Sequence, residues 1–472
     1  MAARMWPAGW APAGAALLAC AMIGVIAGVN PRAGVFVTIA LAFAVLTFAD
    51  LTTGLVILIV VVFAETTPLA GPAVTFTKLT GLILACAWIA RLTTRPAGSD
   101  RLLFNEHPIL SYLLLAFITW VTIGSTWAAD PAATLTDASR FLLVGILYVI
   151  VYTAVGTRDA AVRVLATLIA AAAVTSAYGL VLRPEGNLEN LDRLTSTIRD
   201  PNVLAAILVG GFSLAGAAIL ALRGLTGPRL AASAAAVLCV GALFLTGSRG
   251  GIICFGVALL VAVLIAGRWR AKLALIAVLI AGGSLVYFAL YAPPEIRERL
   301  GNATQGEVEQ QEGRFTLWAV GWRVVQEDPV IGIGAGNFKE VAVEHVLEPG
   351  TVFRTDRVID NPGGVHNSYL QLLSETGVIG LALYLAIVLS SLAAGLRAAR
   401  TFERIGDWRM EIMARGSVVA MMGVLAANFF ISQDSGKVLW LLLALGPALL
   451  GVAHAAERDG YGAERSAAMS DS

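Results

Sequence analysis

The chain alternates long apolar runs with short polar connections, and this pattern predicts a series of membrane-spanning helices. A bilayer core about 30 Å thick requires roughly 20 apolar residues per helix. The second to fourth runs are short, so some of them are expected to be half-spans or bent helices. We predict an all-α polytopic integral membrane protein with about 12–14 transmembrane helices. The predicted spans are residues 11–29, 33–49, 51–66, 74–90, 109–128, 141–156, 160–182, 203–222, 230–246, 250–266, 273–291, 369–396, 412–431 and 436–454.

Composition supports this prediction and excludes a soluble enzyme. Of 472 residues, 58% are hydrophobic and 14% are charged, and the mean hydropathy is +0.79. Soluble domains are about 25% charged. The net charge of +1 gives no field that would attract nucleic acid, so we expect no nucleic-acid partner. The cysteines lie inside apolar runs, and paired Cys/His ligands are absent from the sequence, so we expect no metal site.

The distribution of Lys and Arg predicts the orientation, because basic residues in short loops stay cytoplasmic. Clusters at residues 268–272 and 397–409 place both termini inside and one long segment outside. The last residues are small and polar, and we expect them to be frayed. The predicted organisation is an N-terminal transmembrane bundle (1–291), a large structured extracytoplasmic loop (292–368), C-terminal transmembrane helices (369–454) and a cytoplasmic tail (455–472).

The long loop is expected to contain interfacial helices. Residues 314–326 place Phe315, Trp318, Trp322 and Val325 on one helical face, which suits a helix lying among lipid headgroups. Pro329 is expected to end this helix. The run at 330–338 superficially resembles a dinucleotide-binding fingerprint, but no βαβ pattern surrounds it, and we interpret it as a tight glycine turn.

Ionisable residues beside spans are the candidates for chemistry, because an arginine at a helix centre costs about 2.5–3.5 kcal/mol on the insertion scale. Three outer connections contain such residues. The first includes Arg193, Arg199 and Asn202, the second is the turn around Arg249, and the third leads to His366. Arginines bind phosphate bidentately, and histidine titrates near neutral pH. This combination suits a lipid-linked phosphate substrate.

Each candidate also has a simpler structural interpretation. An arginine at the end of a span is most often a snorkelling anchor, and a lone histidine is more often a hydrogen-bonded interface residue than a catalyst. Arg249 departs from that pattern because glycines flank it in a very short loop on the side that disfavours basic residues. His366 lies at the start of a predicted helix, whose free N–H groups favour an anion.

Four motifs between about residues 190 and 385 resemble the O-antigen ligase and polymerase superfamily. These are bacterial membrane glycosyltransferases that act on glycans linked to undecaprenyl diphosphate. The order and spacing of the motifs carry the resemblance. They are Arg193-Leu194-Thr195 with Asp200-Pro201-Asn202, Thr246-Gly247-Ser248-Arg249-Gly250-Gly251, the segment from Trp318 through Asp328-Pro329 to Asn337-Phe338, and His366-Asn367-Ser368-Tyr369 with Glu375-Thr376-Gly377.

The resemblance implies a metal-independent glycosyltransferase without a cofactor, in the bacterial cytoplasmic membrane, with its active site facing outward. The donor would be an undecaprenyl-diphosphate-linked glycan and the acceptor a glycan, lipid or protein. Arg249 and His366 match the catalytic arginine and histidine of the family directly. Arg193 holds a second arginine position for the diphosphate, but Ser196 stands where glycine is usual, so Arg199 remains an alternative.

Four further residues are weaker candidates on the same ground. Asp434 lies in the outer loop between the last two predicted spans, where some relatives carry an acidic residue, and the others are Arg314, Asn202 and Asn367. The pattern fits a ligase and a polymerase equally, since these differ in the acceptor. A transporter or flippase of lipid-linked glycans is the alternative from another class. Transporters, however, place charged residues and broken helices near the bilayer midplane.

Overall fold

The computed structural model describes residues 10–64, 76–94, 101–182, 193–291, 305–346 and 364–470, and its regular elements in these ranges are all helical. The parts of the predicted loop at 292–304 and 347–363 lie outside the described residues. The elements are α1 (Trp10–Val29), α2 (Pro31–Ala49), α3 (Leu51–Ala64), α4 (Phe76–Thr94), α5 (Leu103–Glu106), α6 (Pro108–Ile123), η1 (Gly124–Thr126), α7 (Pro131–Ala154), α8 (Arg158–Leu182), α9 (Pro201–Ala221), α10 (Gly227–Leu245), α11 (Arg249–Leu264), η3 (Gly267–Trp269), α12 (Arg270–Leu290), α14 (Gln305–Glu327), α15 (Phe338–Val346), α17 (Ser368–Arg404), α18 (Trp408–Ala427) and α19 (Lys437–Ser470).

Each of the fourteen predicted spans coincides with one of these helices. Within the described residues, nine helices are long and apolar enough to cross a membrane alone, or up to ten if α11 and the helix after it form one span bent by 111°. The upper figure of the predicted range, fourteen, counted every apolar run as a span. The 14-residue α3 shows why the structural count is lower, because a helix of that length does not cross the bilayer core alone.

The centre of the bundle is formed by α18 and α19, which are the most deeply buried of the candidate spans and pack against α9, α17 and α7. Small residues allow these backbones to approach closely. A Cβ atom added to Gly416 of α18 would lie 2.3 Å from the Cβ of Ala217 in α9. One added to Gly446 of α19 would lie 2.1 Å from the carbonyl oxygen of Ser391 in α17. These glycines therefore determine how closely the central helices pack.

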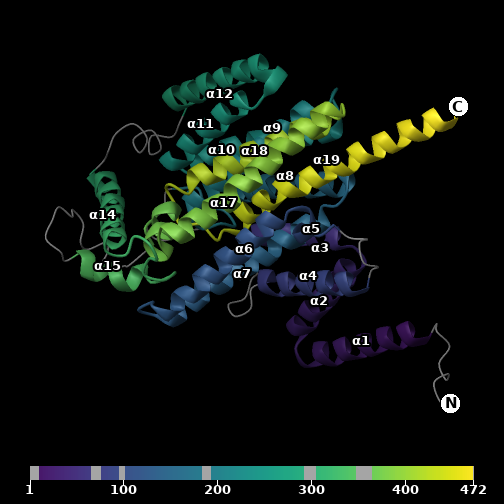
Figure 1. Cartoon of the computed structure of the whole chain (residues 1–472), viewed down its shortest axis with the longest axis horizontal. Helices are drawn as coiled ribbons and strands as arrows, with labels where there is room; N and C mark the ends of the chain where they lie inside the picture. The colour runs from purple at the N-terminus through teal and green to yellow at the C-terminus, as the bar shows by residue number, and fades with distance from the viewer. Residues whose placement is uncertain are drawn as a thin grey trace.

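Helices α14 and α15 lie together at one end of the bundle, as the left side of Figure 1 shows. They share a small apolar core in which Leu317, Val320 and Val324 of α14 pack against Phe338 of α15. Phe315 and Trp322 of the predicted aromatic face are exposed and Val325 is buried, because the residues that pack against α15 form the neighbouring stripe of the helix. The position of this face among lipid headgroups stays a prediction. The helix ends at Glu327, shortly before Pro329, as predicted.

The glycine turn after α14 is confirmed, and it packs against a break in α17. Gly332, Gly334 and Gly336 all have positive φ, at 69°, 91° and 76°. Gly377, inside α17, also has a non-helical backbone, which leaves its surrounding peptide groups available to the turn. Four backbone hydrogen bonds join the two segments: Ile333 N to Ser374 O at 3.1 Å, Gly334 N to Glu375 O at 2.8 Å, Val378 N to Pro329 O at 2.9 Å and Ile379 N to Val330 O at 3.5 Å.

The C-terminal residues are helical. The tail predicted to be frayed instead continues α19 as helix to Ser470, at the yellow end in Figure 1; its alanine, glutamate and arginine residues are good helix formers.

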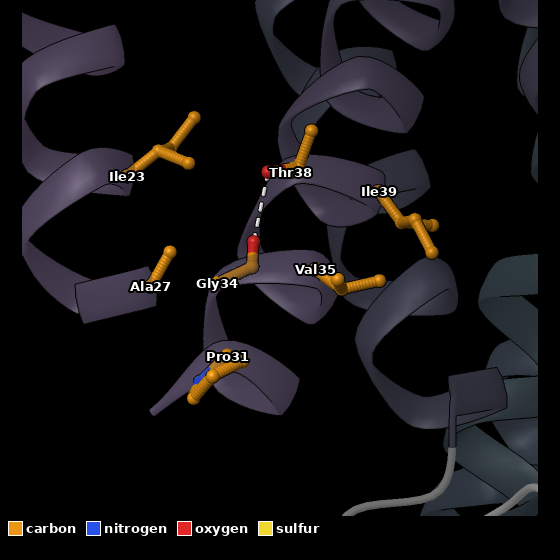
Figure 2. Close-up of a pocket in the computed structure, with 7 residues that line it drawn as sticks. All are labelled: Ile23, Ala27, Pro31, Gly34, Val35, Thr38 and Ile39. Atoms are coloured by element: carbon orange, nitrogen blue, oxygen red, sulfur yellow. Dashed lines mark hydrogen bonds between the residues drawn. The ribbon is translucent and has the colours of Figure 1, made fainter. Parts of the chain in front are cut away.

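At the other end, α1 and α2 line a peripheral pocket of about 350 Å³, where Thr38 Oγ1 donates to Gly34 O (Figure 2). Its lining carries no ionisable side chain, so we assign it no chemistry.

Candidate functional site

The motif that contains Arg193 and the motif that contains Arg249 are joined by a hydrogen-bonded network around Arg193. Arg193 Nε donates to the carbonyl oxygen of Thr246 at 2.8 Å, and Arg193 Nη2 donates to Asn202 Oδ1 at 2.8 Å. The same Asn202 oxygen accepts a hydrogen bond from Ser248 Oγ at 2.8 Å. Leu194 N also donates to Leu245 O at 3.0 Å. Arg193, Asn202 and the turn before Arg249 therefore form one unit, although 46 residues separate Asn202 from Ser248 along the chain.

The local sequence explains why two helices begin at this unit. Asp200 caps α9, since its Oδ1 accepts from Asn202 N at 2.7 Å and from Val203 N at 3.2 Å. Ser248 caps α11, accepting from Gly251 N at 3.1 Å. Both are residue types favoured at the N-cap, and helix N-termini carry partial positive charge. Two such N-termini beside an arginine form an electropositive surface suited to an anion.

Arg249 occupies the first position of α11 and is partly exposed. The preceding Gly247 has φ 58°, a conformation that glycine adopts without strain and that turns the chain sharply into the helix. Gly250 and Gly251 let that helix approach its neighbours. A Cβ atom on Gly251 would lie 2.6 Å from the Cβ of Ala205 in α9, and one on Gly250 would lie 3.0 Å from Phe430. The glycines next to Arg249 thus place its helix against α9 and against the turn that follows α18.

His366 lies exposed immediately before α17, with φ 54°. Among the described residues, it is the only one other than glycine with a positive φ. Such a backbone is uncommon for a residue with a side chain and marks positions that the surroundings hold in place. Asn367 then caps α17, accepting from Tyr369 N at 3.1 Å and Leu370 N at 3.2 Å.

The segment around His366 is held by the turn between α18 and α19. Ser368 N donates to Asn428 O at 2.8 Å, and Ser368 Oγ donates to Ile431 O at 2.8 Å. Gln433 N in turn donates to Ser368 Oγ at 2.8 Å. Residues 428–433 therefore touch both the start of α17 and, through Phe430, the start of α11. The structure thus brings the helices of Arg249 and His366 to one turn at the same end of the bundle.

The remaining candidates are Arg314, Arg199 and Asp434. Burial lowers the pKa of the Arg314 guanidinium in α14, while the negative charge of Asp200, the cap of α9, opposes that shift. Arg199 is exposed on the connection before α9. Asp434 directly follows the turn at residues 428–433, which contacts the starts of α17 and α11. Burial raises the pKa of its carboxyl group to about 6, and Asp137 and Arg140 of α7 are among its charged neighbours.

Sequence reasoning missed the residues that fix the glycine turn. Asn337 is fully buried, and its Nδ2 donates to Thr134 Oγ1 at 2.8 Å while its Oδ1 accepts from Asp130 N at 2.6 Å. Trp120 Nε1 donates to Thr376 O at 2.8 Å, and Trp127 Nε1 donates to Gly332 O at 2.9 Å. An asparagine directly after the glycines was the available signal, but its partners are about 200 residues away in the sequence.

Comparison with known proteins gives one family match. Residues 234–385 match the family model described as O-antigen ligase. This confirms the resemblance to the O-antigen ligase and polymerase superfamily, and it supports a role in glycan transfer during cell-envelope polysaccharide synthesis. The matched range is about a third of the chain and contains Arg249, Arg314, His366 and Asn367. No curated protein matches the chain.

Proposed function

We propose that this multi-pass membrane protein, whose residues 234–385 match the O-antigen ligase family, transfers a glycan from an undecaprenyl-diphosphate carrier to an acceptor at the outer face of the cytoplasmic membrane. One observation carries the proposal. Arg193 is hydrogen-bonded to the turn that starts α11 with Arg249, beside the starts of two helices. Arginines and helix N-termini are the groups that bind a diphosphate without a metal ion.

The reaction follows from these groups. The hydroxyl oxygen of the acceptor attacks the anomeric carbon of the lipid-linked sugar and forms a new glycosidic bond. The bond from that carbon to the diphosphate oxygen breaks, its electron pair goes to the diphosphate, and the anomeric centre is inverted. Negative charge therefore develops on the leaving diphosphate, where Arg249 and Arg193 stabilise it. Removing one preorganised donor of this kind commonly costs about 10²–10³ in rate.

His366 takes the acceptor proton in this mechanism. A positioned general base contributes about 10²–10⁴ in rate. Its side chain is exposed next to the capped start of α17, so an acceptor hydroxyl has access to it. Asn367 acts through the backbone, because its cap fixes the direction in which α17 leaves His366.

The choice between the two candidate arginines falls on Arg193. Its guanidinium is held by Thr246 and Asn202, which preorganises its charge, whereas Arg199 is exposed. We assign direct contact with the diphosphate to Arg193 and a weaker, screened attraction of the substrate to Arg199. Asn202 is a positioning residue, since it orients both Arg193 and Ser248.

Reconstituted protein tests the proposal. Purified protein in liposomes is given radiolabelled undecaprenyl-diphosphate glycan and candidate acceptors, and release of free undecaprenyl diphosphate is measured. We expect release by the wild type, loss of most release in His366→Ala and Arg249→Ala, and normal release in Arg229→Ala. Arg229 is a matched control because it lies near the start of α10 and donates to Gly224 O, away from the site. The size of the labelled product separates a polymerase from a ligase.

Transport of the lipid-linked glycan is the second candidate, since α17 is broken at Gly377 and broken helices occur in transporters. The glycine turn occupies that break, however, through backbone bonds to Glu375 and Val378. The same liposomes decide between the two. Movement of the labelled lipid across the bilayer without any release would contradict the transferase and support a flippase.

A further inference from the structure

An apolar cavity lies between helices at the end of the bundle opposite Arg193 and Arg249. Its volume is about 360 Å³, within the range of small-ligand pockets. The cavity is lined by the second half of α9 and by the first half of α18. The opposite ends of these helices, the start of α9 and the end of α18, lie near the arginine site. Helices α10, α11 and α12 complete the wall. Representative lining residues are Phe212, Gly216, Ala236, Ala258, Ala277 and Val419.

The lining of the cavity contains a buried hydrogen-bond donor without a partner among the described residues. Trp269 lines the cavity, and its Nε1 is buried with no hydrogen-bond partner among the described residues. A buried indole N–H normally has an acceptor, because leaving it unpaired costs free energy. The serine hydroxyls of the lining donate within their own helices, Ser213 to Val209 O and Ser233 to Arg229 O. The indole therefore points to an acceptor that comes from a ligand.

The same end carries an excess of positive charge. Arg268, Arg270 and Lys272 are exposed around Trp269, and Lys272 Nζ lies 5.2 Å from the centre of the indole ring. The carboxylates here are those of Glu411 and Glu403. Arg268 pairs with Glu411 at 2.7 Å, and Arg415, which lines the cavity, pairs with Glu411 at 3.1 Å and with Glu403 at 2.8 Å. This end of the bundle thus has four basic side chains and two carboxylates, which leaves an excess of positive charge.

We propose that this cavity binds one acyl chain of an anionic phospholipid, with Trp269 Nε1 donating to a headgroup or ester oxygen and the basic residues facing the phosphate. The apolar wall suits the chain, the unpartnered indole N–H needs an oxygen acceptor, and the excess of positive charge selects an anion. Basic pockets between membrane helices are known to bind acidic lipid headgroups.

A phospholipid fits this place better than the polyprenyl diphosphate donor. The cavity lies at the far end of α9 and α18 from Arg193 and Arg249, so a diphosphate held there would be remote from those arginines. Two phosphate-bearing lipids share the recognition chemistry, and the experiment below distinguishes them. Its readout is retained lipid, so its outcome is independent of whether the protein transfers glycans.

Native mass spectrometry of the full chain tests this site. Delipidated protein is incubated with phosphatidylglycerol, phosphatidylcholine or undecaprenyl phosphate, and the bound lipid is counted. We expect retention of phosphatidylglycerol by the wild type. Ala277→Trp, which fills the cavity from α12, should reduce retention at least tenfold, since excluding as few as two buried CH₂ groups weakens binding about tenfold. Trp269→Phe keeps an aromatic ring but removes the N–H donor, and it should weaken retention about tenfold.

Controls make the result decisive. Ala281→Trp adds the same side chain to an exposed position of α12 outside the cavity lining, and it should bind as the wild type does. Ala236→Phe fills the cavity from α10, so the test does not depend on one variant folding. Unchanged retention of phosphatidylglycerol in both filling variants would overturn the proposal. Equal retention of phosphatidylcholine, or preferential retention of undecaprenyl phosphate, would overturn the choice of an anionic phospholipid.

Discussion

Asn202 offers the sharpest test of the arginine site, because one oxygen of its side chain holds two other members of the network. Its Oδ1 accepts from Arg193 Nη2 and from Ser248 Oγ, both at 2.8 Å. Replacement by alanine removes this acceptor, and with it both hydrogen bonds, without removing an arginine. A hydrogen bond to a charged group contributes about 1.5–3 kcal/mol and a neutral one about 0.5–1.5 kcal/mol. The two bonds together are therefore worth about 2–4 kcal/mol.

If that free energy serves to orient Arg193 in the transition state, Asn202→Ala should lower kcat/KM by about 30- to 1,000-fold. The upper end requires that water cannot replace the lost oxygen, and Asn202 is partly exposed, so we expect the lower part of this range. The assay is the release of undecaprenyl diphosphate at several donor concentrations. Melting temperature is measured in parallel, since a folded variant should keep most of its stability.

Asn202→Asp is the matched variant. A carboxylate keeps both hydrogen bonds but neutralises much of the charge on Arg193, so the KM for the anionic donor should rise while the protein stays folded. Activity of Asn202→Ala within about twofold of the wild type would refute the reasoning, because the network would then have no role in positioning. Wild-type KM in Asn202→Asp would show that the charge of Arg193 is not used.

Three further predictions concern other parts of the molecule. His366→Gly should fold normally, since glycine tolerates the φ of 54°, yet lose most transfer in the liposome assay; normal transfer would remove the imidazole from the mechanism. Asn337→Ala should destabilise the protein by about 2–4 kcal/mol, because it removes buried hydrogen bonds to Asp130 and Thr134. The melting temperature should fall, and an unchanged melting temperature would contradict the role of that side chain. Burial raises the pKa of Asp434 from 3.8 to about 6, so the folded state binds the proton more tightly than the unfolded state, and the free energy of unfolding should fall as pH rises from about 4 to 6. Asp434→Asn should flatten this fall, and an identical pH profile of stability in that variant would refute the role of this carboxyl group.

Much of the fold could be predicted from the sequence alone. Apolar length is a local property, and bilayer thickness converts it directly into helices, so every predicted span is helical. Caps were equally local, since Asp200, Ser248 and Asn367 each hydrogen-bond backbone groups two or three residues ahead. The spacing of four motifs then indicated the superfamily that the match at residues 234–385 confirms.

Other features depended on partners far along the chain. The bond between Asn202 and Ser248, and the contact of Phe430 with Gly250, require helices to be packed before they exist. The packing of α14 also depends on a later segment, because the aromatic stripe of that helix does not reveal that α15 covers the neighbouring stripe.

The sequence by itself determined that this protein is a helical membrane protein with basic and histidine residues at the helix starts of one end. Only the tertiary structure decided that Arg193 joins the network around Ser248 and Asn202 and that one turn, at residues 428–433, contacts the starts of both α11 and α17. The physical reason is the range of the interactions. Hydrophobic burial and helix capping depend on a residue and its near neighbours, whereas a site made of several helices depends on packing, in which glycine and alanine contacts determine which segments meet.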